Sequence, residues 1–300
     1  MDANRAIVVA MVIAMLFSGC TTMRTPYIRP EIHAPAQYQH ADSAAPSSPS
    51  HWWRIFGDPQ LDALIDAALA RNNDLALAAL NVRSAQLQAH LAVINPTLSV
   101  GYTDDYMREL AGPASATQFH SLTASASYEV DLWNQLGATL DVARWEARAT
   151  EQDRESAVVT LIGTAVNLYY QLANLNYRIT LGRQSVGYGR QALDLVQAQA
   201  SAGAATQLEI AESEQSLEVQ EADQSALLEQ RIETRSAMTM LLNGAPWPET
   251  QERSAVPDDP PPPIAPGLPA SLLDRRPDLR AAEIRLREAL AQTDATRLSF

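Results

Sequence analysis

The sequence predicts a mainly α-helical protein with one β-hairpin inserted between long helices. Three observations support this fold class. A stretch of roughly 70 residues from Trp133 contains no proline and repeats apolar residues at alternating three- and four-residue steps. A strict alternation of apolar and polar residues precedes it, as is typical of strands. A Gly- and Ala-rich turn at residues 201–206 then separates two helical patterns, which indicates a coiled-coil-like antiparallel helical hairpin.

The composition excludes several classes of function. The chain has 300 residues and a net charge of -13, so it is a poor candidate for binding nucleic acid or anionic lipid surfaces. Its five histidines are scattered without metal-ligand spacing. The sequence has no phosphate-binding loop, dinucleotide fingerprint or nucleophile elbow. We therefore expect no catalytic residue, no metal site and no cofactor, and we do not expect an enzyme.

The N-terminus has the layout of a secretory signal peptide over residues 1–19. A polar start precedes an apolar run that is too short for a spanning helix, and two small residues follow it. Cys20 is the only cysteine, so it forms no intrachain disulfide. The stretch "LFSGC" resembles the lipobox of bacterial lipoproteins, which implies a covalent lipid on Cys20. The alternative is an ordinary signal peptide followed by an incidental cysteine.

Residues 20–60 are rich in Pro, Ser and Ala and are predicted to form an extended tether, acylated at its start. A helix is expected over 61–96, with Asp58 and Pro59 at its start and Pro96 ending it. Three aromatic residues are predicted to dock the tether onto the body: Trp52, Trp53 and Phe56.

Residues 97–132 are predicted to form a hairpin from two alternating segments, 97–103 and 121–132. Each segment has an apolar face and a polar face, and the second is long enough to cross a membrane as a strand. Periodicity alone fits a hairpin in a soluble sheet equally well. In a membrane channel, Glu129 and Asp131 would face the lumen and favour cations. Two tyrosines on the apolar face are placed for a membrane interface: Tyr102 and Tyr128.

Residues 133–243 are predicted to form the long helical hairpin, with its first helix spanning roughly 100 Å. Asp131 is a candidate N-cap for this helix. Glycines 182, 187 and 189 predict a local bend or break. The turn contains Gly203 as a left-handed cap and Thr206 as an N-cap for the second helix. The predicted tip consists of Ala202, Gly203, Ala204, Ala205 and Thr206.

Residues 244–270 are a proline-rich connector, and residues 271–300 then begin a second copy of the first helix. Eight identical pairs are separated by the same 204 positions: Leu69/Leu273, Arg71/Arg275, Asp74/Asp278, Leu75/Leu279, Ala78/Ala282, Arg83/Arg287, Ala85/Ala289 and Gln88/Gln292. The sequence therefore predicts an internal repeat.

Several segments resemble the outer-membrane efflux lipoproteins of the TolC-like family, of the NodT type. They are "GCTTMRTPYIRP", "WWRIFGDPQLDALIDAALARNNDLALAALNVRSAQ", "SYEVDLWNQLGA" and "GLPASLLDRRPDLRAAEIRL". The similarity covers essentially residues 16–300. In that family each protomer has two repeats, each with a β-hairpin and long helices. Three protomers close one barrel that continues into a periplasmic helical tunnel.

The resemblance implies a passive exit duct for drugs or other small molecules, the outer-membrane component of a tripartite efflux pump. It implies a homotrimer at full length, and a periplasmic adaptor and an inner-membrane RND transporter as partners. It favours the membrane interpretation of the hairpin and an adaptor contact at residues 202–206, although a helical hairpin needs a turn there in any case. Thr21 after the lipidated cysteine favours the outer membrane over the inner one.

The chain departs from this family by stopping at Phe300, within the first helix of the second repeat. The resemblance therefore implies an incomplete TolC-like fold, truncated in the second repeat, from either a fragment or a broken reading frame. We expect impaired or absent transport by this product alone. Two alternatives remain. One is a non-conducting outer-membrane scaffold lipoprotein that binds an adaptor. The other is an efflux duct for metal cations, which should carry methionine clusters that the sequence lacks.

Overall fold

A computed structural model describes most of the chain: residues 24–35, 51–108, 116–257, 260 and 269–299. The chain divides into two compact units, which are described separately. The first unit comprises Met1–Ile32, Asn81–Gln152 and Asp278–Phe300, and the second comprises His33–Leu80 and Asp153–Pro277. The predicted signal peptide and Cys20 lie outside the described residues, as do parts of the tether and of the connector.

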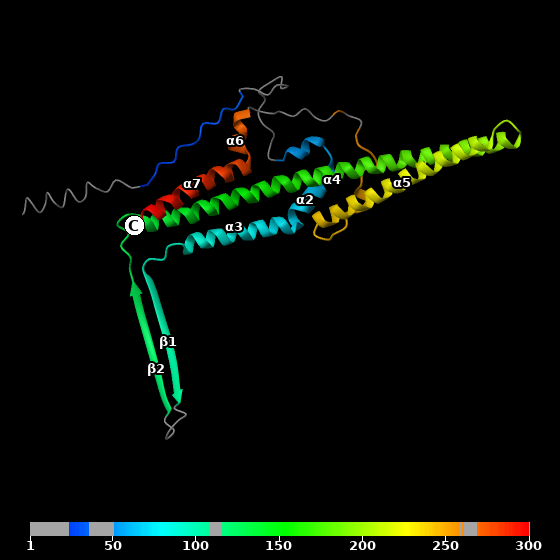
Figure 1. The fold of residues 1–300 in the computed structure, drawn as a ribbon. Helices are drawn as coiled ribbons and strands as arrows, with labels where there is room; N and C mark the ends of the chain where they lie inside the picture. Colours follow the sequence, from blue (N-terminus) through cyan, green and yellow to red (C-terminus); the bar gives the residue numbers. More distant parts are fainter. Residues whose placement is uncertain (1–23, 36–50, 109–115, 258–259, 261–268, 300) are drawn as a thin grey trace, which may run out of the picture. The chain divides into compact units, whose positions relative to one another are not determined.

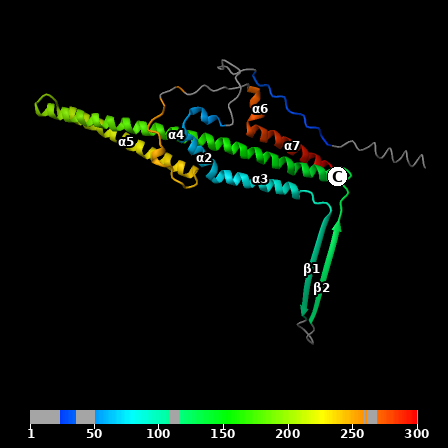
Figure 2. The ribbon, with the colours of Figure 1, turned by 180° about the vertical axis from the view of Figure 1, so that it is seen from behind.

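The second unit contains the main hydrophobic core. Its elements are the short 3-10 helix η1 (Trp52–Phe56), α2 (Pro59–Arg71), the C-terminal part of α4 (Gln135–Ser201) and α5 (Gln207–Leu241). Figures 1 and 2 show α5 running back along α4 from the tip. The core consists of Trp53, Leu61, Leu64, Ile65, Ala68, Leu161, Ile162, Ala165, Val166, Tyr169, Leu172, Met238, Leu242 and Trp247.

The start of α2 confirms the sequence prediction. Asp58 is the N-cap, its carboxylate accepts bonds from the amides of Gln60 and Leu61, and Pro59 is the first helical residue. Trp53 just upstream is only 3% exposed, and Trp52 and Phe56 pack against the same core. The aromatic cluster therefore docks the chain entering α2, as predicted.

The long first helix of the hairpin is present, and its predicted bend is not. α4 runs unbroken through the three glycines. A Cβ atom on Gly182 would lie 2.1 Å from Oε1 of Gln224, and one on Gly189 would lie 3.2 Å from Cδ1 of Leu217. These two glycines face α5, and their missing side chains leave room for the side chains of α5 where the two helices lie close together. They do not break α4.

The prediction of one continuous helix over 61–96 is wrong, because the helix is interrupted at Asn72. Asn72 has φ -66° and ψ 127° between α2 and α3 (Asn73–Leu91), and its side chain accepts a bond from the amide of Leu75. The uninterrupted apolar pattern concealed this second N-cap.

The same break recurs in the second copy. Arg276, 204 positions after Asn72, has φ -70° and ψ 119° between α6 (Leu272–Arg275) and α7 (Pro277–Arg297). Proline disfavours the helical conformation in the residue before it, which explains the break here. The two copies therefore share a helix–break–helix geometry as well as sequence.

The first unit contains the hairpin. β1 (Thr97–Arg108) and β2 (Ala116–Ser127) are antiparallel, with Thr97 opposite Ser127 and Arg108 opposite Ala116. Figure 1 shows the two strands as a ribbon leading into α4. The second strand begins earlier than predicted and ends at Ser127, so residues 128–132 lie beyond the ladder. Both faces of both strands are exposed in this chain.

The helix α4 also contains an 18-residue window that is apolar and long enough to cross a membrane, and 39% of that window is buried within the protein. A buried core helix has the same properties, and α4 supplies residues to the core of the second unit. From the sequence, which has no long apolar run after residue 19, we expect no helical membrane span there, and this stays a prediction.

Candidate functional site

The hairpin has one apolar face and one hydroxyl-rich face. The register places Val100 opposite Ala124 and Tyr102 opposite Leu122 on the apolar face. Ser and Thr residues dominate the other face, where the hydroxyls of Ser99 and Ser125 lie 2.7 Å apart. A ribbon with two such exposed faces can separate an apolar medium from a polar one.

The apolar face of the β-hairpin gains polar residues toward the strand ends at Arg108 and Ala116. Asp104 lies opposite His120 on this face, with 3.3 Å between Oδ1 and Nδ1. The hydroxyl of Tyr102 lies 2.9 Å from the same His120 nitrogen, and Gln118 donates to Asp104. We call Tyr102, Asp104, Gln118 and His120 the Asp104 cluster. Sequence reasoning missed it, although Asp104 and His120 occupy positions where the apolar alternation predicts apolar residues.

A second set of polar contacts joins the two strands at the end of the β-hairpin next to the helices, here called the hairpin foot. The side-chain amide of Asn95 donates to the carbonyl of Glu129 at 2.6 Å and accepts from its amide at 3.0 Å. These side-chain bonds join the chain two positions past the last ladder pair, Thr97 and Ser127. Asp131 accepts a bond from the amide of Gly137 at 3.1 Å, in the first turn of α4. The helix starts at Gln135, so Asp131 serves its N-terminus from outside the N-cap position. A lumen-facing role for Glu129 and Asp131 stays a prediction.

The tip of the helical hairpin is a tightly bonded turn. Gly203 has φ 75°, and the amide of Ala204 donates to the carbonyl of Gln199 at 2.8 Å. Thr206 and Glu209 form a reciprocal capping box. These bonds to the Glu209 carboxylate lower its pKa. The predicted left-handed cap and N-cap are confirmed, and Ala202, Gly203, Ala204 and Thr206 are exposed while Ala205 is half-buried.

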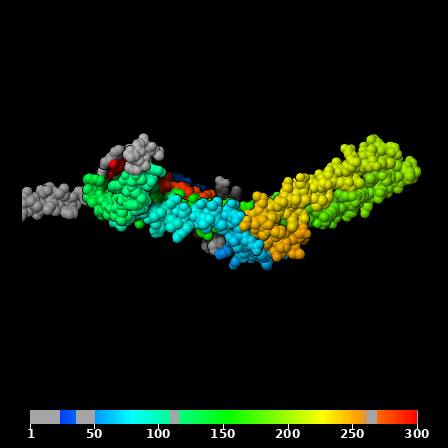
Figure 3. Space-filling view, turned by 90° about the horizontal axis from the view of Figure 1, so that it is seen from below, coloured from blue at the N-terminus to red at the C-terminus, as the bar shows by residue number. Residues whose placement is uncertain are grey.

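A shallow groove lies between α4 and α5, in the part of the helical hairpin near its tip. It has a volume of about 450 Å³ and contains Tyr188, which is 70% exposed. Figure 3 shows α4 and α5 lying against each other up to the tip. The groove is lined by Ser185, Tyr188, Gly189, Ala192, Ser213, Ser216 and Gln220.

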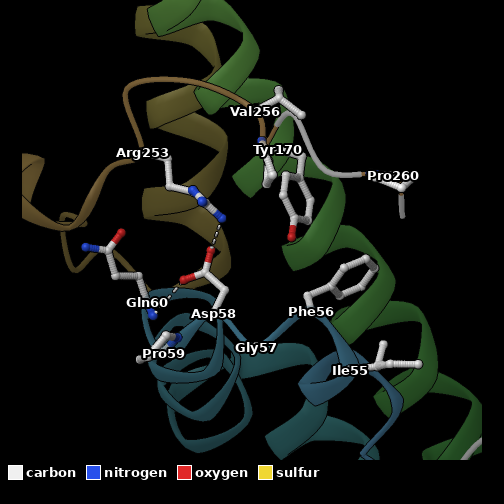
Figure 4. Close-up of a pocket in the computed structure, with 11 residues that line it drawn as sticks. Ile55, Phe56, Gly57, Asp58, Pro59, Gln60, Tyr170, Arg253, Val256 and Pro260 are labelled. Carbon is white, nitrogen blue, oxygen red and sulfur yellow. Dashed lines mark hydrogen bonds and ion pairs between the residues drawn. The ribbon is translucent and has the colours of Figure 1, made fainter. Parts of the chain in front are cut away.

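A buried polar network lies at the start of α2 (Figure 4). The Tyr169 hydroxyl donates to Oδ2 of Asp58 at 2.8 Å, and Arg253 pairs with the same oxygen at 2.8 Å. Burial, followed by this bond to Asp58, raises the pKa of Tyr169. A pocket of about 950 Å³, with Phe56 and Tyr170 in its wall, opens beside the network.

The network continues into the connector. The carboxylate of Glu252, whose side chain is 3% exposed, pairs with Arg231 at 2.7 Å and also with Arg235. Asn176 on α4 donates to the carbonyl of Arg253 at 2.8 Å. These bonds hold the chain after α5 against both helices, so we assign the network a structural role.

The extended segment 24–32 binds the helices of the first unit and is here called the N-terminal strap. Arg24 pairs with Asp141 on α4. The amide and hydroxyl of Thr25 donate to Asp294 on α7 at 2.8 and 2.7 Å. Further along, Tyr27 lies under the guanidinium of Arg287 at 4.4 Å, and Arg29 pairs with Glu283. Sequence reasoning missed the strap, since low-complexity composition does not reveal which residues bind.

The carboxyls of Glu146 on α4 and Glu288 on α7 lie next to each other. Burial, and then the neighbouring carboxyl of Glu146 to which it is hydrogen-bonded, raise the pKa of Glu288. Among the residues that the structure describes, no group of three or more His, Cys, Asp or Glu side chains is arranged to hold a metal ion.

Comparison with known proteins gives one consistent result. The family model for outer membrane efflux proteins matches residues 64–244. The chain is 33% identical to the pyoverdine export outer membrane protein OpmQ of Pseudomonas putida, covering 94% of this chain and 63% of that protein. It is 26% identical to toxin and drug export protein A of Aggregatibacter actinomycetemcomitans, covering 99% and 65%. The chain thus spans less than two thirds of these relatives.

Solved structures share the fold. The outer-membrane channel OprN superposes with a TM-score of 0.76 at 24% identity, over 91% of this chain and 64% of that one. The CmeC outer-membrane channel of Campylobacter jejuni gives 0.77 at 19% identity, over 93% and 62%. The predicted TolC-like fold class is therefore confirmed.

Proposed function

Because the chain belongs to the outer membrane efflux protein family, we propose that it supplies the wall of a passive exit duct for small molecules in the outer membrane. The β-hairpin is the main observation that supports this proposal. One of its faces is apolar, the other is hydroxyl-rich, and it leads into a 67-residue helix. A lone hairpin has unpaired edges that lipid cannot satisfy, so it must close with strands from other copies or repeats. Energy would come from an inner-membrane partner, and the chain itself would perform no catalysis.

The tip is the proposed contact for a periplasmic adaptor, which would link this chain to the inner-membrane transporter. The turn at residues 202–206 is small, largely exposed and fixed by its own hydrogen bonds. A preorganised turn loses little conformational entropy when a partner binds it. The groove below it, with exposed Tyr188, offers an aromatic anchor for a partner helix.

The proposed lipid on Cys20 would be attached a short distance along the chain from Arg24. Three residues lie between Cys20 and Arg24, so at most about 14 Å of extended chain joins them. Arg24 is held by Asp141 in the first turns of α4, close after the second strand. Substituting Cys20→Ala should weaken outer-membrane retention in cell fractionation, while Ser18→Ala, which leaves the thiol in place, should not. Equal retention of both variants would refute the anchor.

One experiment tests conduit and adaptor contact together. Cells lacking their own outer-membrane efflux proteins would express an adaptor, a transporter and this chain carrying Ala204→Cys at the tip. Expected results are lower accumulation of a fluorescent efflux dye and thiol cross-linking to the adaptor. Glu229→Cys, an exposed site on α5 away from the tip, is the matched control and should cross-link much less. Cross-linking without a fall in dye would favour the non-conducting scaffold, and neither result would contradict the proposal.

A further inference from the structure

The ladder shows where the lipid-facing surface of the hairpin ends. Counting along the register, the apolar face continues from Val100 and Ala124 to Tyr102 and Leu122. The next pair on the same face is Asp104 opposite His120. A carboxylate facing hydrocarbon is strongly unfavourable, so this rung marks an outer limit of any lipid contact.

The opposite end of the apolar face is equally defined. Thr97 opposite Ser127 is the last pair of the ladder, and residues 92–96 and 128–134 on either side of it are not in strands. Asn95 and Glu129 are joined through the Asn95 side chain. The last ladder pair on the apolar face is therefore Leu98 opposite Ala126.

From these limits and the proposed membrane function, we infer that the ladder faces hydrocarbon from the rung of Leu98 and Ala126 to the rung of Tyr102 and Leu122, and no further. The outer part of the hairpin, from the Asp104 cluster onward, then projects beyond the hydrocarbon.

The aromatic residues agree with these limits. Tyr102 lies at the last apolar rung, and its hydroxyl reaches His120 in the Asp104 cluster. Tyr128, 68% exposed, comes directly after Ser127, the last residue of the ladder at its other end. Tyrosines are enriched at both interfaces of a bilayer, where the ring meets lipid and the hydroxyl meets water.

Beyond the boundary, apolar residues also occur on the face that is otherwise hydroxyl-rich. Phe119 lies opposite Asp105 on the otherwise hydroxyl-rich face, and Met107 is its neighbour there. Between the two limits this face carries only uncharged small residues on β1: Ser99 and Gly101. The alternation that fits a membrane thus holds only inside the inferred span.

Single cysteines test this depth assignment, since Cys20 is the only native cysteine. Outer-membrane fractions of cells expressing the chain would be treated with a membrane-impermeant maleimide, with the parent chain as background. We expect Val100→Cys and Ala124→Cys to react at least about tenfold more slowly than Asp104→Cys and Gln118→Cys. Ser99→Cys on the polar face should react readily, and detergent should expose Val100→Cys and Ala124→Cys.

The outcomes separate this inference from the proposed function. If Asp104→Cys and Gln118→Cys are as protected as Val100→Cys, the hairpin is in the membrane but the boundary is wrong. If Val100→Cys and Ala124→Cys react as fast as Asp104→Cys, the hairpin is not in lipid, and both proposals fail. A second readout is the protein recovered in the outer membrane: Val100→Arg should reduce it several-fold, and Gln118→Arg should leave it unchanged. Equal recovery of the two arginine variants would overturn the boundary.

Discussion

The core of the second unit and the hairpin of the first contain similar apolar residues in opposite settings. Leu61, Leu64 and Ile65 of α2 are completely buried among residues of α4 and α5. Leu98 and Leu122 of the hairpin are 80% and 75% exposed. The core thus obtains its hydrophobic stabilisation from this chain alone, whereas the hairpin must obtain it from lipid or from other strands.

The largest expected change in stability comes from replacing leucine by alanine in the core, compared with the same replacement in the hairpin. Leu64→Ala removes buried contacts and leaves a cavity, so it should destabilise the helical core by about 2–5 kcal/mol. Leu98→Ala removes an exposed side chain and should change the same unfolding transition by less than about 0.5 kcal/mol. Chemical unfolding of the purified chain, followed by circular dichroism of the helices, measures both. Similar losses would show that the hairpin is packed within the protein.

How far the sequence predicts this contrast depends on the range of the interactions. The alternation of the strands, the Asp58 N-cap and the turn at Gly203 are local, so patterns and cap preferences were sufficient to predict them. The break at Asn72 was missed because an unbroken apolar pattern concealed it. The strap was missed because Thr25 and Asp294 meet across 269 positions, and nothing near either residue indicates the other.

The polar network at the margin of the core should show the second-largest effect. Tyr169→Phe removes the hydroxyl that donates to buried Asp58, and it should cost about 1–3 kcal/mol, because the carboxylate loses a buried partner. Tyr177→Phe is the control: this ring is 48% exposed, and the change should stay within about 0.5 kcal/mol. The free energy of unfolding measures both. The network would be dispensable if the two variants were equally stable.

A smaller and local effect is expected at the strap, the part of the first unit that is held by polar contacts. Asp294 is buried and accepts both bonds from Thr25, so Asp294→Ala should release the strap. Trypsin cleavage after Arg24 should then accelerate by roughly tenfold, as expected for losing buried acceptors. Gln292→Ala, an exposed position on the same helix, should leave the cleavage rate unchanged. An unaltered rate in Asp294→Ala would mean that the other strap contacts suffice.

The smallest effect is expected at the helical tip, which has neither a core nor a lipid-facing surface. The Glu209 carboxylate accepts bonds from the amide and hydroxyl of Thr206, and these bonds lower its pKa. A carboxyl whose pKa is lowered on folding contributes stability above its ordinary pKa and loses it as the pH falls through the lowered value. Amide exchange in a peptide spanning the tip, corrected for intrinsic rates, should therefore rise below about pH 4.

The substitution Glu209→Gln distinguishes this capping box from a general acid effect. The amide side chain does not titrate, so the additional exchange at low pH should disappear, while Glu212→Gln, an exposed neighbour one turn further on, should preserve it. If both variants keep the acid-induced exchange, the turn is held by Gly203 and its backbone bonds alone. The proposed adaptor contact would then depend on backbone geometry, and the side chain of Glu209 would contribute nothing to it.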